Sequence, residues 1–242
     1  METQNPDTPR GHGADRTRRL ALTALLLLVP APSLGAAMAM KVAPGPIGQT
    51  VFLVSKIWLL IFPLVWSALF DPERPTIPRP TRTGMWAACI SGTVIFLGIA
   101  GVYSVADRWQ WFDAAALSAT AKGLGLTTPL IYLAGAVYWC TVNSILEEYV
   151  WRWFVFTRCE SLLSRPLAVV ASAVCFTLHH IIALSAYFNG PVTLLASLGV
   201  FIGGATWSWL YLRYRNVYAS WVSHVFADIV IFVIGYRLIF GS

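Results

Sequence analysis

The sequence predicts an all-α integral membrane protein, a polytopic bundle of about seven transmembrane helices with six to eight as the range. Three observations support this prediction. Hydrophobic residues make up 57% of the 242 residues and charged residues 12%, whereas a soluble domain has about 25% charged residues. The apolar residues form runs of about 20, the length that an α-helix needs to cross a bilayer. The basic residues lie scattered at the ends of these runs, so the net charge of +6 indicates membrane topology and no nucleic-acid partner.

The first apolar run, residues 20–40, follows a polar tail at residues 1–19 that carries four arginines. Pro30 and Pro32 interrupt this run, because proline removes a hydrogen bond from a helix interior. A retained first helix and a cleaved signal peptide both fit a Leu-rich run that ends in small residues. We favour the retained helix, and either choice leaves the other spans unchanged.

Six further apolar runs complete the predicted bundle. These spans cover residues 49–70, 85–105, 129–157, 166–188, 191–213 and 218–240. Residues 71–83 are rich in proline and arginine, so we expect an aqueous loop there. Tryptophans among charged residues at 106–127 predict a segment at the level of the lipid headgroups. The chain thus divides into a cytoplasmic tail at 1–19 and a membrane domain at 20–242, whose part at about 129–240 carries the motifs described below.

The distribution of lysine and arginine predicts the orientation in the membrane. Eleven of these residues lie in the tail and in the loops after the second, fourth and sixth spans, whereas four lie on the other side. Cytoplasmic loops carry an excess of Lys and Arg, so we expect a cytoplasmic N-terminus and a C-terminus outside. Lys56 lies in the first third of its span, where its long stem is expected to carry the ammonium to the interface.

Ionisable residues within the predicted spans gather in three of them. The fourth, fifth and seventh spans hold Glu147, Glu148, Arg152, His179, His180, His224 and Asp228. One acid or arginine at mid-bilayer costs about 2.5–3.5 kcal/mol on insertion scales, so such a cluster is by default a functional hypothesis. The four cysteines contain no CxxC pair, and they indicate neither a disulfide framework nor a zinc knuckle.

The spacing of these residues predicts how they meet. Glu148 and Arg152 are four residues apart, so they share one helix face and are able to form an ion pair. Glu147 lies about 100° round the same helix and must have a different environment. His224 and Asp228 are also four residues apart. At 1.5 Å per residue the motifs of the three spans lie about 15–21 Å from the cytoplasmic side, so they are expected to meet near mid-membrane.

Three motifs follow one another along these spans: Glu147-Glu148-x-x-x-Arg152, Phe176-x-x-x-His180 and His224-x-x-x-Asp228. Together they resemble the CPBP family of intramembrane proteases, which includes the CAAX prenyl endopeptidases of the Ras-converting type. The resemblance covers about residues 143–228, and the first three spans contribute nothing to it. The family pattern allows Asn or Asp at the last position, where this chain has Asp228.

The resemblance implies an endopeptidase that hydrolyses a peptide bond of a membrane-associated substrate, with a prenylated CAAX-type peptide as one candidate. It implies four catalytic residues, Glu147, His180, His224 and Asp228. It implies three supporting residues, Glu148, Arg152 and Phe176. Glu147 with His180 would polarise the attacking water, while His224 and Asp228 would contact the tetrahedral oxygen. The implied partners are a membrane-embedded or lipidated peptide or protein and the lipid bilayer.

Structural readings of the same residues stay open beside the catalytic ones. Glu148 and Arg152 would equally serve as an ion pair that locks the helix, and His179 is expected to point elsewhere. We expect no cofactor, and the chain has no HExxH run, no GxSxG elbow and only one aspartate within a span. If a zinc ion were bound, Glu147, His180 and His224 would supply suitable ligand types.

Two other classes of function use buried ionisable residues. A proton- or ion-coupled transporter would use the Glu, His and Asp cluster as a relay, but transporters usually contain internal repeats and we find none. A haem protein with His180 and His224 as axial ligands would leave the pair of glutamates unexplained. The sequence therefore favours the protease.

Overall fold

The computed structural model describes residues 9–71, 78–123 and 125–241. Within these ranges the chain is almost entirely helical and contains no strand. Seven helical segments are long and apolar enough to cross a membrane. The predicted fold class is therefore confirmed, and the protein is an integral multi-pass membrane protein of the all-α class.

Each of the seven segments overlaps one predicted span, and the fifth ends at Leu184, four residues before its predicted end. The segments are Asp15–Val42, Pro46–Phe70, Arg82–Arg108, Pro129–Leu162, Arg165–Leu184, Gly190–Tyr214 and Val217–Phe240. The fourth is the longest, because its helix continues past the predicted end at residue 157. Residues 1–8 of the predicted tail and residues 72–77 of the predicted aqueous loop lie outside the described residues.

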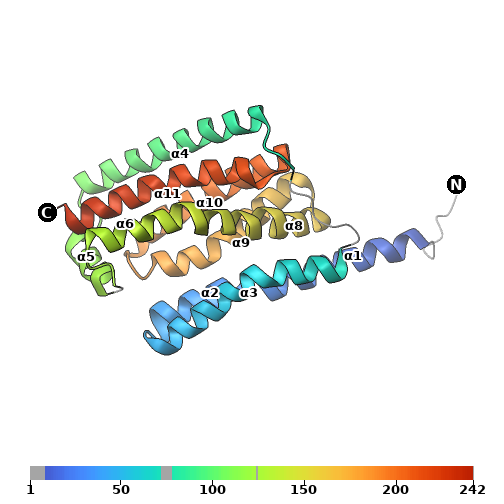
Figure 1. Ribbon diagram of the computed structural model, residues 1–242, viewed down its shortest axis with the longest axis horizontal. Helices are drawn as coiled ribbons and strands as arrows, with labels where there is room; N and C mark the ends of the chain where they lie inside the picture. The colour runs from blue at the N-terminus through green and yellow to red at the C-terminus, as the bar shows by residue number, and fades with distance from the viewer. Residues whose placement is uncertain (1–8, 72–77, 124, 242) are drawn as a thin grey trace.

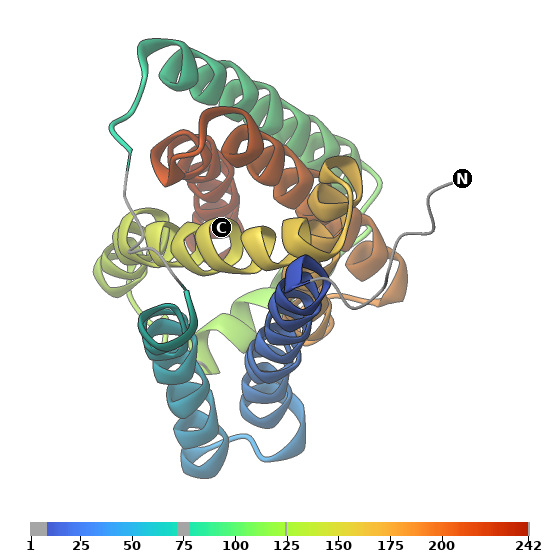
Figure 2. The same ribbon diagram turned by 90° about the vertical axis from the view of Figure 1, so that its right-hand side faces the viewer.

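The N-terminal helices form one flank of the molecule (Figure 1). This flank consists of α1 (Pro9–Leu28), α2 (Pro30–Ala37), the π-helical η1 (Met38–Val42) and α3 (Pro46–Phe70). A turn at Val29 separates α1 from α2 at the predicted proline interruption. Gly45 has a φ of 120°, a conformation that side chains disfavour, and it makes the turn into α3. The helix α4 (Arg82–Arg108) lies on the opposite flank (Figures 1 and 2).

The remaining helices fill the space between the two flanks (Figure 2). They include α9 (Arg165–Leu184), α10 (Gly190–Tyr214) and α11 (Val217–Phe240). The short helix α5 (Ala114–Gly123) packs on the end of α11, where the Ser118 hydroxyl donates to the Ile239 carbonyl at 3.4 Å. A position of residues 106–127 at the headgroup level stays a prediction.

The fourth span is one continuous helix with two π-helical stretches. In chain order it consists of α6 (Pro129–Tyr138), η2 (Trp139–Asn143), α7 (Ser144–Glu148), η3 (Tyr149–Phe156) and α8 (Thr157–Leu162). A π-helical turn holds more residues than an α-helical turn, so it rotates the side chains that follow it. The two glutamates therefore lie on a short α-helical turn between two π-helical stretches, which have more than 3.6 residues per turn. Such π segments are frequent at functional sites.

Side-chain caps mark the starts of five helices among the described residues. Each cap accepts a hydrogen bond from a backbone N–H in the first turn that follows it, and the caps are Thr81, Asp113, Thr128, Asn189 and Asn216. Five helices, α2, α3, α6, α9 and α10, carry a proline in their first turn, at a position whose N–H would have no helical partner. The first N–H groups of a helix have no acceptor within the helix, so the caps satisfy them and the prolines remove one of them, and both mark where the helix begins.

The core of the bundle is aromatic. Trp151, Phe154, Phe176 and Trp207 are at least 96% buried and belong to one packed cluster. At Gly92 on α4, an added Cβ would lie 2.9 Å from the ring of Phe226 on α11, so this glycine lets the two helices approach closely. The core therefore holds the central helices in one arrangement beneath the polar cluster described below.

The close approach at Gly92 predicts a local loss of stability on enlargement. Gly92→Leu should lower the free energy of unfolding by about 1–3 kcal/mol, because the new side chain would displace Phe226. Gly98→Leu is the matched control on the same helix, since a Cβ there meets nothing within 4 Å. Thermal melts in detergent compare the two variants, and equal melting temperatures would contradict the packing described for α4 and α11.

Candidate active site

The buried carboxylate of Glu148 lies at the centre of the polar cluster. It is fully buried, and each of its oxygens has a charged or titratable partner. Arg152 Nε donates to Oε2 at 3.0 Å, and His224 Nδ1 lies 2.9 Å from Oε1. The predicted i to i+4 ion pair is therefore present. The histidine joins it from α11, so this one carboxylate connects the fourth and seventh spans.

Arg152 extends the same cluster to two further helices. Its side chain is fully buried, and Nη1 donates to the Ser208 hydroxyl on α10 at 3.4 Å. The guanidinium carbon lies 4.9 Å from the ring centre of Phe176 on α9 and 5.5 Å from that of Trp207 on α10. Aromatic faces attract a cation, so these rings contribute to holding the arginine inside the bundle.

His224 faces three carboxylates and two aromatic rings, those of Trp207 and Phe176. Its Nε2 lies 4.0 Å from Glu147 Oε2 and 3.6 Å from Asp228 Oδ1, distances that allow attraction without a direct hydrogen bond. The imidazole stacks on the Trp207 indole with 3.8 Å between ring centres and 16° between planes. Trp207 and Glu148 together fix the plane of this ring, and its Nε2 edge faces Glu147 and Asp228.

Glu147 has a different environment from its neighbour, as its position on the helix predicts. Its side chain keeps 14% of its accessible surface, whereas Glu148 keeps none. Asn143 Nδ2 donates to Oε1 at 2.9 Å, and the Lys56 ammonium lies 4.0 Å from the same oxygen. The second oxygen, Oε2, accepts no hydrogen bond from the described residues. It faces His224.

The tautomer of neutral His180 follows from its hydrogen bond. Nδ1 lies 2.9 Å from the carbonyl oxygen of Phe176, which is able only to accept. Nδ1 therefore carries the hydrogen, and in the neutral ring Nε2 keeps its lone pair. The Phe176 ring packs against the imidazole at 4.4 Å between centres. Phe176 thus supports both His180 and Arg152.

His179 does not point elsewhere, in contrast to the expectation from sequence. Ligand atoms of Glu147, His179 and His180 all lie within 4.8 Å of one another, and this group does not include His224. The His179 ring stacks on the Trp151 indole at 5.2 Å and 8°. Its Nδ1 is buried without a hydrogen-bond partner among the described residues. A carboxylate and two imidazoles are ligand types that would suit zinc. The possible ligand group in the structure therefore contains His179 in place of the His224 that the sequence predicted.

Four side chains of this cluster were not identified from the sequence: Lys56, Asn143, Trp207 and Ser208. Asn143 lies four residues before Glu147, so the spacing rule that paired Glu148 with Arg152 would have found it. Lys56 lies on α3, and Trp207 and Ser208 lie on α10. Neither helix carries one of the three motifs, so no signal in the sequence pointed to these residues. Lys56 was expected at the interface, but its ammonium donates to Asn143 Oδ1 at 3.1 Å.

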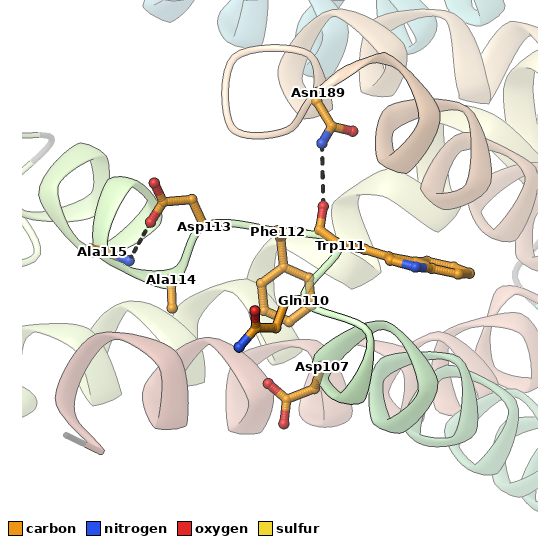
Figure 3. A pocket seen from close by; sticks show the side chains of 8 residues that line it. All are labelled: Asp107, Gln110, Trp111, Phe112, Asp113, Ala114, Ala115 and Asn189. Carbon is orange, nitrogen blue, oxygen red and sulfur yellow. Dashed lines mark hydrogen bonds between the residues drawn. The ribbon is translucent and has the colours of Figure 1, made fainter.

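A pocket lies apart from the cluster, between the end of α4, the start of α5 and the turn before α10 (Figure 3). Its lining residues are Asp107, Gln110, Trp111, Phe112, Asp113, Ala114, Ala115 and Asn189. Asp113 accepts from the Ala115 N–H at 2.9 Å, and Asn189 Nδ2 donates to the Trp111 carbonyl at 3.2 Å. These polar groups serve the local backbone, and none belongs to the predicted motifs.

A comparison with protein families identifies the second half of the chain. Residues 127–230 match the family model described as type II CAAX prenyl endopeptidase Rce1-like. No curated protein and no solved structure matches the chain. The matched range contains the three predicted motifs and leaves out α1 to α5. It therefore leaves out Lys56.

The buried ion pair predicts coupled losses of stability. Arg152→Met should lower the free energy of unfolding by about 3–5 kcal/mol, because it leaves the Glu148 charge buried without its cation. Adding Glu148→Gln to Arg152→Met should recover part of this loss. Thermal melts of the single and double variants in detergent measure the coupling.

The control for this measurement is Arg165→Met, because the Arg165 side chain is 73% exposed and its removal should change the melting temperature little. If the loss of stability in the double variant equals the sum of the losses in Glu148→Gln and Arg152→Met, the two residues do not form the proposed pair.

Proposed function

Over residues 127–230 the chain belongs to the Rce1-like family of type II CAAX prenyl endopeptidases, and on this premise we propose an intramembrane endopeptidase that acts by Glu- and His-activated water. The observation that supports this proposal best is the asymmetry of the two glutamates. Glu148 has a partner on each oxygen, whereas Oε2 of Glu147 accepts no hydrogen bond from the described residues and lies 4.0 Å from His224 Nε2. A carboxylate oxygen of Glu147 also lies within 4.8 Å of His179 and His180. The family match gives no support to the transport alternative.

Water activation is assigned to Glu147 with His180. A water about 2.8 Å from each group would bridge the separation of at most 4.8 Å between their ligand atoms. Glu147 would accept a proton from this water while the water oxygen attacks the carbonyl carbon of the substrate. The neutral tautomer of His180 supports the proposal, because Nε2 is able to accept a hydrogen bond from the water. The proton would then pass to the leaving nitrogen as the C–N bond breaks.

Stabilisation of the tetrahedral oxygen is assigned to His224 and Asp228. With Nδ1 bonded to Glu148, His224 donates from Nε2 only when both nitrogens carry a hydrogen. The Glu148 carboxylate and the stacked Trp207 face both favour the imidazolium cation. Asp228, one helical turn later, would donate from a protonated carboxyl. The two donors would then face the oxygen from one helix, α11.

We propose that this hydrolysis needs no metal ion. Glu147, His179 and His180 have the donor types of a zinc site, and a zinc ion held by them would polarise the substrate carbonyl. The Lys56 ammonium, however, lies 4.0 Å from Glu147, and it would repel a divalent cation on that carboxylate. The protein thus already supplies a positive charge where the metal would bind.

The proposed substrate is a membrane-associated peptide, with a prenylated CAAX-type C-terminus as the first candidate. The printed family description motivates this candidate. The proposed orientation has the N-terminus in the cytoplasm and the C-terminus outside, because eleven basic residues lie on the side of the N-terminus and four on the other.

The assignment of the water predicts the effect of two substitutions. Glu147→Gln and His180→Ala should each lower kcat by at least about 100-fold while the protein stays folded, because general acid and base groups typically contribute 10²–10⁴-fold. The assay follows release of the C-terminal tripeptide from a farnesylated CAAX-type peptide in detergent, with a chelator in a parallel sample. Asp107→Asn, which lies outside the cluster, is the control.

Near-normal turnover in either folded variant would refute the assignment of the water. Loss of wild-type activity in the chelator, restored by added zinc, would refute the metal-free mechanism alone.

The donor role of Asp228 predicts that an amide is tolerated. Asp228→Asn should keep kcat within about 10-fold of wild type, because an amide donates a hydrogen bond at every pH. Asp228→Leu, of similar size but without a donor, should lose far more. A pH–rate profile of Asp228→Asn with activity lost at every pH would instead mean that a carboxylate orients His224, since loss of such an orienting acid costs about 10⁴-fold in serine proteases.

A further inference from the structure

Lys56 places an ammonium group beside the proposed base, and it lies outside the segment that matches the family. Its Nζ donates to Asn143 Oδ1 at 3.1 Å and lies 4.0 Å from Glu147 Oε1. The ammonium also lies 5.7 Å from the ring centre of Phe52 and 5.2 Å from that of Trp139. Polar partners and aromatic faces thus surround a charge within a span, where a lysine without partners is costly.

The position of Lys56 follows from how α3 docks on the fourth span. Arg158 holds Asp71 through two hydrogen bonds of 2.8 Å and 2.5 Å, and the Tyr149 hydroxyl donates to the Leu60 carbonyl at 3.1 Å. Lys56 and Asn143 are 87 residues apart, and so are Asp71 and Arg158. The two helices therefore run parallel in one register. The charged pair at their ends fixes the depth of Lys56.

The contact with Lys56 determines which way the Asn143 amide faces. An ammonium has only donors, so the amide oxygen of Asn143 must face Lys56. The amide nitrogen then faces Glu147, to which it donates at 2.9 Å. With the amide turned over, its oxygen would face the carboxylate, and the two acceptors would repel each other. Lys56 thus selects the orientation in which Asn143 holds Glu147 Oε1 and leaves Oε2 free.

We propose that Lys56 is a positioning residue of this endopeptidase, supplied by α3, that orients the Glu147 carboxylate through the Asn143 amide. The proposal rests on the proposed function of Glu147. The groups around Glu147 are Lys56 on α3, Asn143 and Glu148 on its own helix, His179 and His180 on α9, and His224 and Asp228 on α11. Among these, Lys56 alone belongs to the part of the chain that the family model does not match.

Steady-state kinetics on the full-length protein test the proposal. Lys56→Met should lower kcat by about 10–100-fold, the usual cost of losing a partner that orients an active group, and should leave KM within about two-fold. Lys56→Arg should restore most of kcat, because a guanidinium also has only donors. The matched control is Lys41→Met, a lysine of the same N-terminal flank that donates to the Ser185 carbonyl at 3.4 Å. It should match the wild type.

A double-variant cycle tests whether Lys56 acts through Asn143. Asn143→Leu should lower kcat, and Lys56→Met added to it should cause little further loss. Losses that multiply would overturn the proposed route through the amide. A rise in KM with unchanged kcat would overturn it too, because Lys56 would then bind the substrate directly. Equal kinetics of Lys56→Met and Lys41→Met would remove Lys56 from the reaction.

A spectroscopic measurement separates this proposal from the proposed function. The side-chain amide resonance of Asn143 in ¹⁵N-labelled protein, assigned by its loss in Asn143→Leu, should shift in Lys56→Met and stay in place in Lys41→Met. Lys56→Gln replaces Lys56→Met in every comparison if the latter does not fold, as judged by thermal melts. A wild-type protein that cleaves nothing would count against the proposed function alone. An unshifted amide resonance would count against the role of Lys56.

Discussion

The Glu148 carboxylate is the interaction on which the polar cluster depends. It lies inside a transmembrane bundle without exposure to solvent, and each of its oxygens has one cationic or titratable partner. Neither lipid nor apolar side chains would replace those partners, so Arg152 and His224 must both reach it at once. That requirement fixes the fourth span against the seventh. Arg152, through Ser208, Phe176 and Trp207, extends the constraint to α9 and α10.

The same constraint explains why two adjacent glutamates have different environments. Since Glu148 faces the interior, Glu147 is turned toward α3 and α9, near His180, and its oxygen without a hydrogen bond lies beside His224. The proposed chemistry follows from this difference, because a carboxylate paired with Arg152 and His224 is a weaker base toward water than one with an oxygen that accepts no hydrogen bond. The π-helical stretches on either side of the pair adjust the phase of the helix, so Asn143 and Arg152 both face their partners.

The sequence was sufficient for the fold class and for contacts along one helix. Seven apolar runs predicted seven spans, and the i to i+4 rule predicted the pairs Glu148 with Arg152 and His224 with Asp228. Contacts between helices could not be read in this way. The bond between Glu148 and His224 joins residues 76 positions apart, and it depends on helix rotations that the π-helical stretches change.

Lys56 and His179 illustrate the same limit. Rules for one helix in isolation did not predict the contacts of either residue. With α3 held in register by Asp71 and Arg158, the Lys56 ammonium contacts Asn143 across the helix boundary, and whether its stem also reaches the interface stays a prediction. His179 likewise finds a stacking partner, Trp151, across a helix contact that spacing alone does not predict.

We propose that water attacks the substrate beside Glu147 without a covalent intermediate. Single-turnover cleavage of a farnesylated CAAX-type peptide in water enriched in oxygen-18, with hydroxylamine present, distinguishes this from an acyl-enzyme route. Direct attack by water should give a new C-terminal carboxyl with one labelled oxygen and no hydroxamate. A hydroxamate on the new C-terminus would reveal an acyl-enzyme intermediate and would refute direct attack by water.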